Sequence, residues 1–248
     1  MNDATISAIV LLTVFGGALL GMFLSSVLPP HHLSGDAKDT VRVGIGLVLT
    51  ITALVLSLLI ASAKSYFDAQ NTELTEMAAN AVVLDRILAH YGPEATEARG
   101  ELRDSVARLL DRIWSKKGGG VAPASGANEF LYDKLQELSP QNDAQRSMQA
   151  QALSVALALG QKRWLMYEQS AAGISTPLLL VMVFWLTIVF SSFGLFSPRN
   201  STVVIGLFLC ALAASGAVFM ILEMYSPFTG LLHISDAPLR AALVHLGQ

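Results

Sequence analysis

Four long apolar stretches divide the chain, and its charged residues lie between and around them. The stretches cover approximately residues 6–28, 41–63, 176–196 and 202–222. A helix needs about 20 apolar residues to cross the hydrocarbon core of a bilayer, and each stretch meets that requirement. The pattern therefore predicts four transmembrane helices, grouped in two hairpins.

The polar residues between the hairpins predict a soluble helical insert at residues 64–172. Near its start, apolar residues repeat at alternating steps of three and four, as in a coiled coil; these positions, which we call the seam, are Leu74, Met77, Ala81, Leu84, Leu88 and Tyr91. No helix-breaking residue separates the seam from the second apolar stretch, so one helix is expected to leave the membrane and to end at Gly92-Pro93. The seam packs either inside the chain or around an oligomer axis.

A short tail follows the second hairpin. The hairpins are expected within residues 1–63 and 173–223, and the tail comprises residues 224–248. Ser235-Asp236 followed by Pro238 is typical of a helix start, so a short amphipathic helix is expected in the tail. The predicted fold class is all-α: an integral membrane protein in which two transmembrane hairpins flank a helical insert and the second transmembrane helix extends into it.

Composition supports a membrane protein. Hydrophobic residues make up 53% of the 248 residues and charged residues 14%, against about 25% charged in an ordinary soluble domain. Twelve of the sixteen Lys and Arg residues lie between Lys64 and Arg163, which leaves the apolar stretches nearly free of charge. The net charge of −3, without any basic patch, predicts no nucleic-acid partner. The expected partner is a lipid bilayer.

The orientation follows from the basic residues near the ends of the spans. With four spans, both termini and the insert share one side of the membrane, and Lys and Arg are enriched on the cytoplasmic side. The insert side carries four such residues and the other side three: Lys64, Lys162, Arg163 and Arg240 against Lys38, Arg42 and Arg199. We therefore expect the insert and both termini in the cytoplasm. Met1-Asn2-Asp3 carries no positive charge, so the first stretch is expected to be a retained helix and not a cleaved signal.

Several short motifs carry a resemblance to a known family. They are Ala53-Leu54-Val55-Leu56, Ile60-Ala61-Ser62-Ala63-Lys64, Leu84-Asp85-Arg86, Tyr91-Gly92-Pro93-Glu94, Leu102-Arg103 and Glu223-Met224-Tyr225-Ser226-Pro227-Phe228-Thr229-Gly230. Over nearly its whole length the chain resembles the bacterial bestrophin-like membrane proteins, a domain family of unknown function. The resemblance implies four spans around a helical insert and a bacterial inner membrane.

The family name points to the bestrophins, which are pentameric anion channels. This likeness implies a homo-oligomer that passes an inorganic ion through a pore on the second-span helix. Residues 45–60 contain no aromatic residue, however, and the chain lacks an acidic cluster for a bestrophin-type calcium clasp. Anion selectivity and calcium gating therefore do not carry over with the topology.

One face of the second span carries small and hydroxyl-bearing side chains at helical spacing. Its residues are Gly46, Thr50, Ala53, Ser57 and Ala61, which we call the small-residue face. In an oligomer these positions would converge on an axis, where hydroxyl groups hydrate passing ions, so they are candidate pore-lining residues. The alternative is close helix packing, which small side chains also permit.

Two further sets of residues are candidates for specific roles. Gly17 and Gly21 form a G-x-x-x-G motif with Ser25 one step further, which predicts a helix-packing face. Glu223 is the carboxylate next to the fourth span, and it is a candidate for ion binding or gating together with Lys64. The alternatives for Glu223 are an interfacial residue that reaches the lipid headgroups and a partner for groups at the helix end.

Enzyme signatures do not occur in the sequence. It contains no G-x-x-x-x-G-K-[ST] phosphate loop, no H-E-x-x-H motif and no nucleophile signature, so no catalytic residue and no cofactor is predicted. Cys210 is the only cysteine, which excludes a multi-cysteine metal site. His31-His32 lies on a loop with Asp36 and Asp39 close by, and a metal or pH-sensing site would need these groups to converge; two adjacent histidines on an exposed loop seldom do so, so a solvated turn and no metal site are expected. Two functions remain: an oligomeric ion channel, or a non-conducting scaffold or signalling subunit whose helical insert docks a cytosolic partner through the charged surface between Arg86 and Lys117.

Overall fold

The computed structural model describes residues 2–29, 35–114, 127–171 and 176–247. All regular secondary structure within these ranges is helical, which confirms the all-α fold class. The chain forms two compact units: residues 1–66 with 174–225, and residues 67–173 with 226–248. The tail is therefore grouped with the insert, whereas the sequence pattern treats it as a separate segment.

The first unit contains the four helices that are long and apolar enough to cross a membrane among the described residues. They are α1 (Asp3–Val27), the first part of α2 (Gly35–Tyr91), α6 (Thr176–Phe196) and α7 (Ser201–Met224). Their bounds agree with the predicted spans to within a few residues, except that α2 continues far beyond its apolar stretch. One unbroken helix therefore contributes to both units, as the absence of a breaker predicts.

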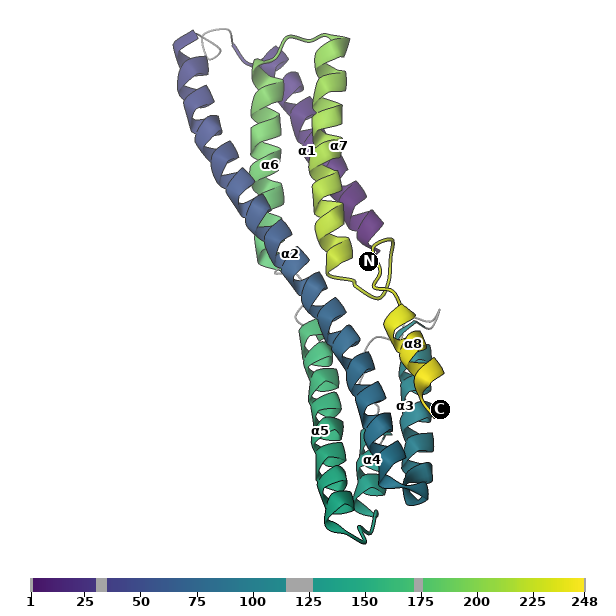
Figure 1. Ribbon diagram of the computed structural model, residues 1–248. Helices are drawn as coiled ribbons and strands as arrows, with labels where there is room; N and C mark the ends of the chain where they lie inside the picture. The colour runs from purple at the N-terminus through teal and green to yellow at the C-terminus, as the bar shows by residue number, and fades with distance from the viewer. Residues whose placement is uncertain (1, 30–34, 115–126, 172–175, 248) are drawn as a thin grey trace. The chain divides into compact units, whose positions relative to one another are not determined.

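Helix α1 packs against both α6 and α7 in the first unit (Figure 1). Val14 and Ala18 of α1, Met182 of α6 and Val218 of α7 are fully buried there. Many large apolar side chains in this unit are nevertheless exposed, among them Leu12, Phe23, Val43, Leu58, Phe184 and Leu209. A soluble protein rarely exposes so much apolar surface, whereas lipid or another chain covers it in a membrane protein.

The second unit is a helical bundle built around the end of α2. It also contains η2 (Pro93–Ala95), α3 (Thr96–Ile113), α4 (Ala127–Gln136), α5 (Asp143–Ala171) and α8 (Ala237–His245). Helix α4 packs against α3 and α5, and α8 lies beside α3 (Figure 1). Trp114, directly after α3, contacts the tail in two ways. Its Nε1 donates to the carbonyl of Ile234 at 3.1 Å, and its ring packs edge-on against Phe228.

The seam lies in the core of this second unit. All six of its residues are at most 5% exposed, and they share one apolar cluster with residues of α3, α5 and the tail, such as Leu102, Met166 and Leu239. The seam therefore packs inside the chain, which decides between the two interpretations that its spacing permits.

Helix α2 ends because Gly92 leaves the helical backbone conformation. Its φ of 129° lies in a region that residues with a Cβ rarely adopt, and it is followed by Pro93, which cannot continue a helix. The predicted stop after Tyr91 is the observed one.

Candidate functional site

The small-residue face of α2 is not used for packing within the chain. All five of its residues are exposed, and a Cβ added to Gly46 would meet no atom within 4 Å. The buried residues of this part of α2 are Thr52, Leu59 and Ala63. At about 100° per residue, these lie about 140° around the helix from the small-residue face. The face is thus left open for lipid, water or a second chain.

The hydroxyl groups on this face donate to their own helix. Thr50 Oγ1 donates to the Gly46 carbonyl at 2.9 Å, and Ser57 Oγ donates to the Ala53 carbonyl at 2.8 Å. These bonds satisfy the hydroxyl protons, which is essential for a group without water in a bilayer. The lone pairs of both oxygens remain available as acceptors, so the face can solvate a cation or hold water molecules.

Glu223 is buried near the end of α7, with 4% of its surface exposed, whereas Lys64 on α2 is exposed. Each of the two side chains takes part in a polar or electrostatic interaction. Burying a carboxylate costs several kcal/mol unless its surroundings compensate. Its burial argues against a side chain that reaches into the headgroups, and it fits a residue paired at the helix end as well as an ion-binding or gating group.

Aromatic and hydroxyl groups connect α2 with the end of α7. The hydroxyl groups of Ser62 and Tyr225 are 3.1 Å apart, and the rings of Tyr66 and Tyr225 stack with their centroids at 5.1 Å. The sequence pattern does not identify these three residues as a site. Tyr225 belongs to the Glu223-Met224-Tyr225 motif, but nothing in the sequence pairs position 225 with position 62.

The glycine face of α1 lies against α6. A Cβ on Gly21 would collide with the carbonyl oxygen of Ser191, and one on Gly17 would lie 2.9 Å from Ser191 Oγ. The contact is reciprocal, because a Cβ on Gly194 of α6 would collide with a backbone carbonyl of α1. Ser25 instead bonds within its own helix, to the Met22 carbonyl at 2.7 Å. Gly194 was not anticipated, since no second glycine stands four residues from it.

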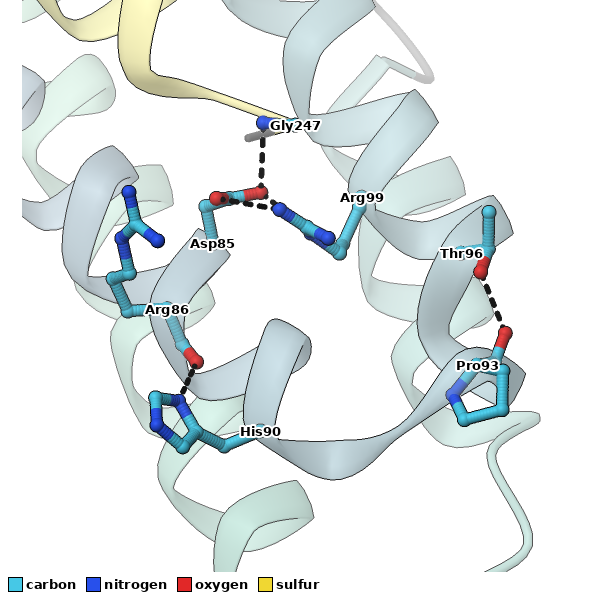
Figure 2. A network of polar contacts seen from close by, with 7 residues as sticks. All are labelled: Asp85, Arg86, His90, Pro93, Thr96, Arg99 and Gly247. Atoms are coloured by element: carbon cyan, nitrogen blue, oxygen red, sulfur yellow. Dashed lines mark hydrogen bonds and ion pairs between the residues drawn. The ribbon is translucent and has the colours of Figure 1, made fainter.

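A buried ion pair joins three segments of the second unit (Figure 2). Asp85 of α2 is 1% exposed, and its two oxygens accept bonds from Arg99 of α3 at 2.8 and 3.0 Å. The backbone N–H of Gly247, near the end of the tail, donates to the same carboxylate at 3.3 Å. The hydrogen bond to Asp85 raises the pKa of Arg99, so this guanidinium stays charged at any working pH. Asp85 belongs to the Leu84-Asp85-Arg86 motif, but nothing in the sequence pattern distinguishes it from an exposed charge beside the seam.

Two local hydrogen bonds lie near this ion pair, one at the end of α2 and one at the start of α3 (Figure 2). His90 Nδ1 lies 2.7 Å from the carbonyl of Arg86, and Thr96 Oγ1 donates to the carbonyl of Pro93 at 2.6 Å. Within the described ranges, no three His, Cys, Asp or Glu side chains gather as metal ligands would. His31-His32 lies outside the described residues.

Comparison with known proteins covers both units. The family model described as Bestrophin-like domain matches residues 12–239. Neither the curated proteins nor the solved structures gave a match. Because the matched residues include nearly all of both hairpins and the whole insert, the chain belongs to the bestrophin-like family.

Proposed function

We propose that this protein is a homo-oligomeric ion channel of the cell membrane in which the small-residue face of α2 lines the pore. The observation that carries the proposal is the sparse packing of α2. Only 11% of the residues in its most apolar window are buried, against 39% for α1. A second copy of the chain can cover such a helix, and small side chains favour close approach between helices in lipid.

The chemistry of the face fits an aqueous axis. Several copies of α2 around an axis would present rings of hydroxyl oxygens from Thr50 and Ser57, separated by the small side chain of Ala53. Larger apolar residues on neighbouring faces, such as Ile51 and Leu58, would contact adjacent copies or lipid. The pore would then conduct an inorganic ion through a lining without charge.

Glu223 and Lys64 are proposed as ion-binding or gating residues at the insert side of the membrane. A buried carboxylate there can bind a cation or change the conformation of α7 when it takes up a proton. Tyr225, bonded to Ser62 and stacked on Tyr66, connects the residues that follow Glu223 to α2. The same side is proposed to be the cytoplasm of a bacterial cell, with the membrane being the inner one.

Electrical recording tests the channel directly. Purified full-length protein in planar bilayers is expected to give single-channel currents. Ser57→Phe is expected to lower the unitary conductance at least about tenfold, because a ring of phenylalanines would fill the axis. The matched control is Leu58→Phe, at the neighbouring exposed residue about 100° around the helix, which should conduct like the wild type. Equal conductance of both variants would contradict the pore assignment.

The second candidate function is a non-conducting scaffold or signalling subunit. A groove of about 660 Å³ on the second unit favours it, with exposed Leu157, Trp164 and Leu165 of α5 among its lining residues. Such a surface fits a helical segment of a soluble protein. A well-reconstituted oligomer without any current, together with a stoichiometric protein partner that copurifies with the full-length chain, would favour this function over the channel.

A further inference from the structure

A cavity of about 320 Å³ lies between the first turns of α2 and the end of α6, beside the proposed pore face. Helix α2 contributes Lys38 and Arg42, one turn apart, α6 contributes Phe193, and Ser197 follows directly after the end of α6. All of these residues belong to the first unit. The cavity is therefore a feature of the membrane-spanning part of the chain.

The lining changes from charged to apolar along the helix axes. Lys38, Arg42 and Leu49 follow one face of α2, at steps of four and seven, and run from its polar start into the apolar stretch. Helix α6 runs towards the same end, where Ser197 follows Phe193 by one turn. Both basic residues thus lie at one end of the cavity, with Ser197 and Phe196, whereas the other end is apolar except for the hydroxyl group of Ser192. A phospholipid has the same order of groups, from headgroup to acyl chain.

The charge at the polar end selects for an anion. Among the described residues that line the cavity none is a carboxylate; Asp39 follows Lys38 in sequence but does not line it. A guanidinium and an ammonium group one turn apart can both donate to phosphate oxygens. At the apolar end, Leu49 and Phe193 are 42% and 40% exposed, so they offer surface to an acyl chain.

We propose that this cavity binds one anionic phospholipid. Its phosphate is held by Lys38 and Arg42, and one acyl chain lies along Leu49 and Phe193. Gly46 borders both the cavity and the small-residue face, so the bound lipid fills the space beside the face that we assign to the pore. This lipid site does not depend on the channel proposal, because a non-conducting scaffold would present the same cavity.

Native mass spectrometry of the full-length protein in detergent tests the site. Dioleoylphosphatidylglycerol is expected to bind more tightly than dioleoylphosphatidylcholine, which has the same acyl chains and no net charge. Each basic residue contributes about 1 kcal/mol to anionic-lipid binding, so the double variant Lys38→Gln/Arg42→Gln should bind phosphatidylglycerol about thirtyfold more weakly, equivalent to about 2 kcal/mol. Equal binding of the two lipids, or unchanged affinity in the double variant, would overturn the proposal.

Two control variants and one alternative test variant keep the result specific. Arg86→Gln removes an exposed charge in the second unit and should leave lipid binding unchanged. The swap Lys38→Arg/Arg42→Lys keeps both charges and should retain affinity to within a few fold. If the double variant aggregates, Ser197→Asp places a negative charge at the polar end and should weaken binding instead.

Inorganic phosphate separates a lipid site from a site for a free anion. Phosphate alone, added at concentrations far above that of the lipid, is expected to displace little phosphatidylglycerol, because it gains nothing from Leu49 and Phe193. Phosphate that displaces the lipid completely at equimolar concentration would show that the cavity recognises the free anion, and the lipid proposal would fail.

Discussion

At the scale of single residues, Asp85 contributes to the stability of the second unit by joining three of its segments. Its carboxylate receives two bonds from Arg99 and one from the backbone of Gly247, so it holds α2, α3 and the tail together. Removing one partner of a buried ion pair costs more stability than the intact pair contributes, because the remaining charge stays desolvated without a partner. Arg99 keeps 22% of its side-chain surface exposed, which moderates this cost.

We expect Asp85→Asn to lower the free energy of unfolding by about 2–3 kcal/mol. The matched control is Asp104→Asn on the exposed surface of α3, which should change it by no more than about 0.5 kcal/mol. Thermal unfolding of the detergent-solubilised protein measures both.

The raised pKa of Arg99 predicts how this ion pair responds to pH. The stabilisation that the charged guanidinium provides is fully present below the pKa of Arg99 in the unfolded chain, and it is lost only as the pH rises through the still higher pKa in the folded protein. Raising the pH from 7 to 10 should therefore leave the difference in unfolding free energy between wild type and Asp85→Asn unchanged, and a smaller difference at pH 10 would contradict the assignment.

At the scale of elements, the sequence predicts the features that depend on the local spacing of apolar and helix-breaking residues. The apolar stretches, the end of α2 at Gly92 and the apolar seam all follow from composition and spacing, and the structure agrees with each. Contacts between distant residues do not follow in this way, since any Tyr near a span could meet any Ser. The bond between Ser62 and Tyr225 and the closing of the tail onto Asp85 therefore required the structure.

The contact between α1 and α6 gives a prediction at this scale. Gly21→Ala would place a methyl group against the Ser191 carbonyl. The nearest atoms belong to the backbone of Ser191 and Leu195, which cannot rotate away as a side chain could. We expect a loss of about 1–3 kcal/mol in the free energy of unfolding, as is typical of overpacking. Gly16→Ala on the same helix adds the same methyl group where no atom lies within 4 Å, and should be neutral or slightly stabilising. Thermal unfolding in detergent compares them, and equal shifts would show that the close approach does not matter.

For the whole molecule, the decisive question is what covers the small-residue face of α2. Family membership and the fold agree on a membrane protein with a helical insert. The sequence predicted the face itself, because five small residues recur at helical spacing, but the spacing is the same for a pore and for a packed interface. In the structure all five residues of the small-residue face are exposed, so this face does not pack against another helix of the same chain.

Thiol accessibility distinguishes water from lipid or protein at this face. In a Cys210→Ala background, cysteines at Thr50 and Ser57 should react with a charged methanethiosulfonate reagent at least about tenfold faster than cysteines at Ile51 and Leu58, which are exposed on neighbouring faces of the helix. The reason is that the reagent and the reactive thiolate both require water, which only an aqueous axis supplies at this depth. In a non-conducting assembly, all four cysteines would face lipid or packed helices and react equally slowly. Uniform slow labelling of a correctly assembled oligomer would therefore exclude an open pore along α2, whereas fast labelling confined to positions 50 and 57 requires one.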